Sequence, residues 1–230
     1  MAAHPSLQTN RRLWISGALL AAAAATWAVL VATAPVDGVQ GVIQKILYVH
    51  VPCAFASYTG FAVTGVFSAL YLWKHDERLD RVALASAEVG VLFCTLVIVT
   101  GPIWAKGTWG HWWSWDPRLT VTLLQWFVYL SYLLLRSFTE GSTRTARFAA
   151  VYGIVGVLAV PLNYFAIDLF GGAAMHPDNL QRGSLGAGMG APFVAGVATA
   201  LLAYVHLLRM RVDLEERRVH SLASFEEFDR

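Results

Sequence analysis

Tryptophan is concentrated in one short stretch of this sequence. Four of the nine tryptophans lie within seven residues, in the run Trp109-Gly110-His111-Trp112-Trp113-Ser114-Trp115-Asp116-Pro117-Arg118, and Trp104 lies just before it. Tryptophan favours membrane–water interfaces, but an interfacial belt spreads over many helix ends, whereas this group is local. Indole faces cover flat apolar ligands, and an arginine such as Arg118 binds a carboxylate through two parallel hydrogen bonds. The run therefore predicts a binding surface for a planar, anionic ligand.

Two histidines, His50 and His176, lie on either side of this run, far from it in the sequence. A single histidine is more often structural than a metal ligand. Two imidazoles on separate segments, however, are what is needed to ligate an iron from both faces while its macrocycle rests on indoles. His111, inside the tryptophan run, is the weaker ligand candidate. The remaining histidines fall in tails, loops or span ends, where solvated or interfacial roles are expected: His4, His75, His206 and His220.

The elements that must position these residues are membrane-spanning helices. The chain of 230 residues is 57% hydrophobic and 14% charged, with a mean hydropathy of +0.52, unlike an ordinary soluble domain. Six apolar runs, uncharged except for Glu88 in the third, are long enough to cross roughly 30 Å of hydrocarbon. They cover residues 13–34, 51–73, 82–104, 119–135, 148–167 and 189–208. We therefore expect an all-α fold, a polytopic membrane protein with six transmembrane helices in a single domain, followed by a cytoplasmic tail over residues 209–230.

The first apolar run ends in Ala32-Thr33-Ala34, which looks like a signal-peptidase site. Its 22 residues exceed the roughly 7–15 apolar residues of a signal peptide. We therefore interpret it as a retained first span.

The lysines and arginines predict how the six spans are oriented. Thirteen of the 17 fall on one side of the spans and four on the other. Cytoplasmic loops carry the excess of positive charge, so both termini are expected in the cytoplasm. In a bacterium this would be the inner (cytoplasmic) membrane, with the tryptophan run, His50 and His176 facing the periplasm.

A short interfacial helix is expected just before the second span. Apolar residues recur there with helical spacing at Val39, Val42, Ile43, Ile46 and Leu47, opposite Gln40, Gln44 and Lys45. That pattern is typical of a helix lying in the membrane interface.

Several function classes are excluded by simple counts. Seventeen basic and 15 acidic side chains give a net charge of +2, too balanced for a nucleic-acid-binding protein. The two cysteines, Cys53 and Cys94, lie in spans, where we expect small buried apolar residues, and they are too few for a disulfide framework. The sequence has no GxxxxGK[ST] loop, so any nucleotide energy must come from another subunit. We expect a binding and transport protein, not an enzyme.

Glu88 is the one carboxylate well inside a predicted span. An intramembrane charge is a functional candidate by default. The interpretation preferred here is a carboxylate near the cytoplasmic interface, neutral or paired with the basic residues of the loop at 74–81.

The motif WGHWWSWDPRLT over residues 109–120, with His50 in YVHVP and His176 in MHP, resembles a known family. It is similar to the haem-handling WWD-domain membrane protein family, most closely cytochrome c maturation protein C (CcmC), and the resemblance covers nearly the whole chain. It implies haem b (iron protoporphyrin IX) held at the outer face, with His50 and His176 as axial ligands. The implied platform is the tryptophan loop, comprising Trp109, Gly110, Trp112, Trp113 and Trp115.

The resemblance also implies partners and charged contacts. The partners would be a periplasmic haem chaperone, the ATPase and membrane subunits of an ABC transporter, and a small single-span subunit. Lys45, Arg118 and Lys106 are candidates to pair with the haem propionates, and Asp116 either orients Arg118 or caps the fourth span. Two positions depart from the family pattern, since His111 replaces a small polar residue and Lys45 replaces a common arginine. Related synthases have further spans and membrane histidines, so a synthase is not expected.

An alternative from another class is a channel or carrier subunit that uses the tryptophans as an aromatic cage for an organic cation, with Glu88 as a relay. Arg118 and Lys106 beside the indoles would repel such a cation. A purely scaffolding membrane subunit would leave the two outward histidines unexplained.

Overall fold

The fold is known from a computed structural model, which describes residues 5–138, 142–170, 176 and 185–228. Every long element in these residues is a helix. In chain order the helices are α1 (Pro5–Thr33), η1 (Val42–Ile46, a 3-10 helix), α2 (Leu47–Lys74), α3 (Glu77–Trp109), α4 (Pro117–Phe138), α5 (Thr143–Val157), α6 (Ala159–Tyr164), α7 (Ala166–Phe170) and α8 (Gly190–Phe228).

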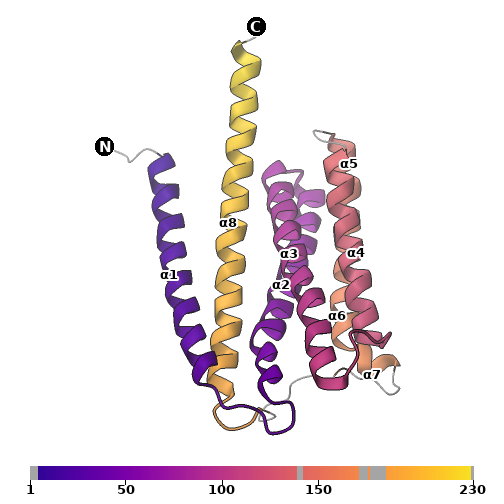
Figure 1. The fold of residues 1–230 in the computed structure, drawn as a ribbon. Helices are drawn as coiled ribbons and strands as arrows, with labels where there is room; N and C mark the ends of the chain where they lie inside the picture. Colours follow the sequence, from indigo (N-terminus) through magenta and orange to yellow (C-terminus); the bar gives the residue numbers. More distant parts are fainter. Residues whose placement is uncertain (1–4, 139–141, 171–175, 177–184, 229–230) are drawn as a thin grey trace.

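The helices form a bundle around the antiparallel pair α2 and α3 (Figure 1). On one side of this pair lies α8, which α1 in turn contacts; on the other lie α4, α5 and α6. Six of the helical segments are long and apolar enough to span a membrane. The prediction of an all-α chain with six spans is therefore confirmed.

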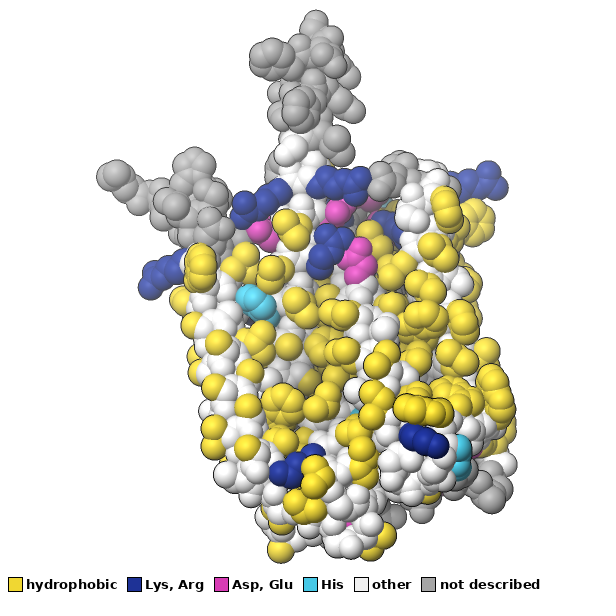
Figure 2. All heavy atoms as spheres, in the orientation of Figure 1, with side chains coloured by type: hydrophobic (Ala, Val, Ile, Leu, Met, Phe, Trp, Pro, Cys, Tyr) yellow, Lys and Arg dark blue, Asp and Glu magenta, His cyan; other side chains and the backbone are white. Residues whose placement is uncertain are grey.

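Charge is distributed unevenly along the bundle. Helix α1 begins and α8 ends at the same end of the molecule (Figure 1). Figure 2 shows most of the visible Lys and Arg side chains gathered at that end, while hydrophobic side chains cover the middle. This arrangement agrees with the uneven distribution of lysines and arginines in the sequence, from which we predict that both termini are cytoplasmic.

The fifth span differs from its prediction because it is not one continuous helix. Residues 143–170 form the separate helices α5, α6 and α7. Pro161 has no N–H with which to bond the Val157 carbonyl. At the same place the Leu158 N–H bonds to the Val155 carbonyl, three residues earlier, at a distance of 3.2 Å. Asn163 of α6, which follows the break, is fully buried in the interior of the bundle.

The segment before α2 also differs from the sequence pattern. The expected interfacial helix is a five-residue 3-10 helix, η1, which leads directly into α2, and Gln44, which was predicted to lie on the polar face, is buried. A 3-10 helix has about three residues per turn, so the stripe inferred from α-helical spacing does not hold. Beyond residue 208, the expected tail remains helical to Phe228 as part of α8.

Helices α2 and α3 cross in very close contact at two glycines. A Cβ atom on Gly60 would lie 2.8 Å from the Gly90 Cα atom. The Gly60 carbonyl accepts a hydrogen bond of 2.7 Å from the Ser86 hydroxyl, which also bonds Tyr204 of α8 at 2.8 Å. This crossing therefore ties three helices together through backbone and small side chains.

Two acidic residues of α3, Asp80 and Glu88, are paired with arginines of other helices. Glu88 binds Arg211 of α8 through both carboxylate oxygens, one at 2.7 Å. Asp80 binds Arg136 of α4 in the same two-pronged way, with distances of 2.6 and 3.2 Å. Glu88 is thus paired as expected, but the predicted partner was wrong, since Arg211 is more than a hundred residues away and only the packing of α8 on α3 brings it close.

Candidate functional site

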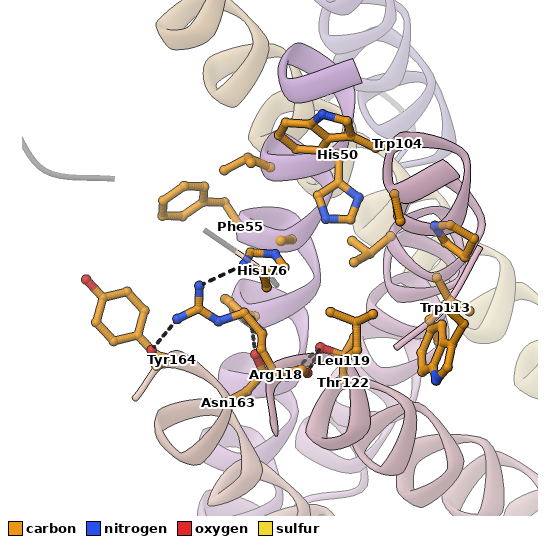
Figure 3. Close-up of a pocket in the computed structure, with 18 of the residues that line it drawn as sticks. His50, Phe55, Trp104, Trp113, Arg118, Leu119, Thr122, Asn163, Tyr164 and His176 are labelled. Carbon is orange, nitrogen blue, oxygen red and sulfur yellow. Dashed lines mark hydrogen bonds between the residues drawn. The ribbon is translucent and has the colours of Figure 1, made fainter. Parts of the chain in front are cut away.

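A cleft opens between α2, α3, α4 and α6 (Figure 3). It lies beside the start of α2 and the end of α3, which Figure 1 shows at the end of the bundle opposite to the start of α1. Its empty space is about 1240 Å³, counting the part open to the surroundings. The walls are mainly apolar and aromatic, including Phe55, Tyr58, Trp104, Trp109 and Trp113. Three residues that the sequence analysis singled out from separate segments also line it: His50, Arg118 and His176.

His50 lies in the first turn of α2 and is buried, with only 8% of its surface exposed. Its Nδ1 atom lies 2.9 Å from the Thr100 hydroxyl of α3. A Cβ atom on Gly101 would lie 3.2 Å from the His50 Cε1 atom, so glycine leaves room for the ring. Trp104 meets the imidazole edge-on, with ring centres 5.7 Å apart. Figure 3 shows the ring directed toward the part of the cleft where His176 lies.

Trp104 is itself held by the loop before η1. Its indole N–H donates to the Gln40 side-chain oxygen at 2.8 Å. Gln40 belongs to a turn in which the Asp37 carboxylate accepts the N–H groups of Val39 and Gln40, at 2.9 and 2.7 Å. These backbone hydrogen bonds lower the pKa of Asp37 from its usual value, and the bond from Gln40 has the larger effect. The turn is therefore best stabilised when Asp37 is ionised, and this support weakens as the pH falls through its folded-state pKa.

The tryptophan loop begins where α3 ends. Gly110 has a left-handed φ of 82° and its N–H bonds to Lys106, whose own ammonium group donates to the Gly110 carbonyl at 2.7 Å. Trp109 and Trp113 line the cleft. Trp112 and Trp115 are 58% and 75% exposed and do not line it. The loop thus divides its indoles between the cleft and the surface.

Arg118 lies in the first turn of α4 and is buried. One guanidinium nitrogen donates to the Tyr164 carbonyl of α6 at 3.0 Å, and another lies 3.2 Å from the His176 Nδ1 atom. Both contacts are drawn in Figure 3. A buried guanidinium at this position makes the cleft suited to an anionic group.

Asp116 is buried and accepts hydrogen bonds from the backbone at two places in the chain. Its carboxylate accepts the Leu119 N–H at 2.9 Å, which caps the start of α4 ahead of Pro117. The other carboxylate oxygen accepts the backbone N–H of His176 at 3.3 Å. The helix-capping role considered from the sequence is seen in the structure, and Asp116 also binds the backbone of His176.

We expect Asp116→Ala to destabilise the protein by about 0.5–2 kcal/mol, the usual cost of losing an N-cap. Asp116→Asn keeps a side-chain oxygen that can accept the Leu119 N–H, and we expect it to lose much less. Thermal unfolding in detergent measures both variants. Equal destabilisation by alanine and asparagine would show that the charge of Asp116 matters more than the cap.

A chain of polar groups forms the floor of the cleft. The Tyr58 hydroxyl donates to Asn163 at 2.7 Å, and the Asn163 amide donates to the Thr122 hydroxyl at 2.8 Å. Thr122 in turn donates to the Arg118 carbonyl at 2.7 Å. Buried hydrogen-bonded networks of this kind hold helices in one arrangement. The sequence analysis missed Tyr58, Thr122 and Asn163, although an asparagine inside an apolar span is a signal that could have led to Asn163.

Two other candidates from the sequence lie outside the cleft. The Lys45 ammonium group donates to the Val31 and Ala32 carbonyls, at 2.8 and 3.2 Å, and so caps the end of α1. His111 is half-buried in the tryptophan loop but is not among the residues that line the cleft.

Comparison with known proteins adds an independent observation. The profile of one protein family, described as heme exporter protein C, matches residues 3–224. The protein named heme exporter protein C of Bradyrhizobium diazoefficiens is 32% identical over 198 residues, which cover 83% of this chain and 74% of that protein. Those of the same name in Haemophilus influenzae and Escherichia coli are 32% and 30% identical and cover 80% of this chain, and 76% and 77% of their own lengths.

Proposed function

Because this chain belongs to the heme exporter protein C family, we propose that it binds haem in the cleft between α2, α3, α4 and α6 and delivers it for cytochrome c maturation. The observation that carries this proposal is the meeting of His50, His176 and Arg118 in one apolar, aromatic cleft. These three residues come from three segments that are far apart in the chain.

The two histidines supply the groups that haem iron requires. Imidazole nitrogen is a common axial ligand of haem iron, and the porphyrin itself provides the other four donors. Two histidines lining one cleft therefore suffice for a bound iron porphyrin, whereas a bare metal ion would need more protein ligands. The cargo proposed is haem b (iron protoporphyrin IX).

The cleft walls match the remaining parts of the cargo. Trp104, Trp109 and Trp113 present aromatic surface to a flat ring, and burial of apolar area contributes roughly 25 cal/mol per Å². Of the three basic residues considered for the propionates, Arg118 lines the cleft, while Lys45 and Lys106 bind backbone carbonyls. We therefore assign the propionate contact to Arg118.

We further propose that the cleft faces the periplasm, from where haem passes to a periplasmic haem chaperone. The gathering of basic residues at the opposite end of the bundle supports this orientation. The proposed assembly contains an ABC transporter ATPase, its membrane subunits and a small single-span subunit. The family's description as an exporter supports such a complex.

The alternative, a channel or carrier for an organic cation, has less support. Buried Arg118 lies in the cleft and would repel a cation. Glu88, the relay considered for that function, is paired with Arg211 and does not line the cleft.

The direct test is the absorption spectrum of the full-length protein purified from haem-replete cells. We expect a Soret band and the α and β bands of a low-spin, bis-histidine haem. Protein that is folded but free of pigment, and that does not bind added haem in detergent, would overturn the proposed function.

Arg118→Ala is expected to weaken haem retention without changing the spectrum of the bound iron. The variant loses a charge-assisted contact to a carboxylate, of the kind worth roughly 1.5–3 kcal/mol, or about 10- to 150-fold in affinity. Haem transfer to an excess of apomyoglobin measures retention. Arg118→Lys, which keeps the charge but loses the two-pronged geometry, should fall between alanine and the unmodified protein. A shift of the absorption bands to those of a different axial ligand would show that Arg118 acts on the iron ligands instead.

A further inference from the structure

The Nδ1 atoms of the two histidines in the cleft contact chemically different partners. The His50 Nδ1 atom contacts a hydroxyl group, that of Thr100. The His176 Nδ1 atom contacts a guanidinium group, that of Arg118. Because a neutral imidazole has one N–H and one bare nitrogen, these partners determine which nitrogen of each ring is able to ligate a metal.

The hydrogen of the Thr100 hydroxyl is already engaged. The oxygen atoms of Thr100 and the Leu96 carbonyl are only 2.6 Å apart, a distance at which a hydrogen must lie between them. A hydroxyl has one hydrogen, so Thr100 can only accept at its contact with His50. His50 must therefore donate from Nδ1, which leaves Nε2 with its lone pair.

The surroundings of His50 hold that ring in place. The ring is packed against the α3 backbone at Gly101 and against the edge of Trp104, which is itself bonded to Gln40. An imidazole whose N–H is fixed by an outer partner is the usual form of a histidine that ligates a metal. His50 is thus ready to ligate before any cargo enters.

His176 is in the opposite condition. Arginine donates hydrogen bonds and accepts none, so the His176 Nδ1 atom is the acceptor at its 3.2 Å contact with Arg118. In a neutral ring the hydrogen then lies on Nε2, and the bare nitrogen is the one that faces the guanidinium. His176 must give up its contact with Arg118 before it can ligate iron.

We propose that Thr100 is a positioning residue that presets His50 as the first axial ligand, whereas His176 ligates second, in exchange for Arg118. This inference rests on the proposed function and adds an order of events to it. Once Arg118 leaves His176, its guanidinium is available for a propionate of the same cargo. Entry of haem and completion of its ligation are thereby coupled.

The first test uses the full-length protein without haem. Nitrogen-15 NMR of histidine-labelled protein in lipid distinguishes the two tautomers, and His50→Gln identifies the His50 signals. We expect the Nδ1–H form of His50 in the unmodified protein and in Thr100→Ser, and a mixture or the Nε2–H form in Thr100→Val. An unmodified His50 in the Nε2–H form, or no change in Thr100→Val, overturns the proposal whether or not the protein binds haem.

Thr95 offers a matched control on the same helix. Its hydroxyl also donates to the carbonyl four residues earlier and accepts a ring N–H, that of Trp126, but it does not touch His50. Thr95→Val should therefore leave the His50 tautomer unchanged. A change as large as that of Thr100→Val would point to a general effect on α3 and contradict a specific role of Thr100.

The second test measures haem. We expect Thr100→Val to lower haem affinity roughly 10- to 100-fold, the usual effect of removing a partner of a metal-bound histidine, with Thr100→Ser close to the unmodified protein. His176→Ala should retain haem in a five-coordinate form, while His50→Ala should lose most of it. Equal losses in the two single variants would overturn the proposed order, while leaving haem binding itself intact.

Discussion

Protein carrying both His50→Ala and His176→Ala is expected to be purified almost without a Soret band, although it is folded and present in the membrane in normal amounts. Both residues line the cleft, and the double variant removes every imidazole that we assign to the iron. Loss of an outer partner of such a histidine costs roughly 10- to 100-fold in affinity. Loss of the ligands themselves should cost more, so we expect haem content to fall by at least about tenfold.

The control for this experiment removes two histidines outside the cleft. His75 is exposed at the end of α2, and His111 is half-buried in the tryptophan loop. The pair His75→Ala and His111→Ala should keep the Soret band at full strength. A normal band in the cleft double variant, or its loss in this control, would place the iron on other ligands.

The second large effect is expected from Gly60→Leu, which should prevent α2 and α3 from packing. Even the first carbon of the new side chain would lie 2.8 Å from the Gly90 Cα atom and 3.1 Å from its backbone nitrogen. Backbone atoms cannot rotate away, so the helices must separate. Overpacking of a core costs about 1–3 kcal/mol and occasionally more, and we expect this variant at or beyond the upper end of that range.

Thermal unfolding in detergent and the yield of monodisperse protein measure the effect of Gly60→Leu. The matched control is Gly190→Leu, since an added Cβ at Gly190 meets no atom within 4 Å. Equal stability of the two variants would show that the α2–α3 crossing tolerates more space than the structure indicates. A shift of α2 relative to α3 should also separate His50 from Thr100, so haem binding is expected to fall with stability in Gly60→Leu alone.

Features that depend only on residues close together in the sequence were predictable. Each of the six spans follows from the apolar character of about twenty consecutive residues, which is a local property. The tryptophan loop and the capping role considered for Asp116 also follow from short motifs, since a cap requires only residues three apart. The break of the fifth span at Pro161 belongs to the same class, although the hydropathy average concealed it.

Residues that act across the bundle were not predictable in the same way. Thr100 is one of several threonines in apolar spans, and nothing near it in the sequence distinguishes it from Thr95. Its contact with His50 joins residues 50 apart in the chain, and that of Tyr58 with Asn163 joins residues 105 apart. Such pairs depend on the rotation and spacing of the helices, which close contacts such as that at Gly60 determine.

By itself, the amino-acid sequence determined that this is a six-span helical membrane protein and which segments carry imidazole, indole and guanidinium groups, because hydropathy and residue type follow directly from the order of residues along the chain. Only the tertiary structure decided which of those groups share a cleft: Trp109 and Trp113 line it, whereas Trp112, Trp115 and Lys45 do not. It also decided which partner each imidazole nitrogen has. The physical reason is that hydrogen bonds and ring contacts depend on distances of a few ångströms between helices, and these distances are set by side-chain packing over the whole bundle.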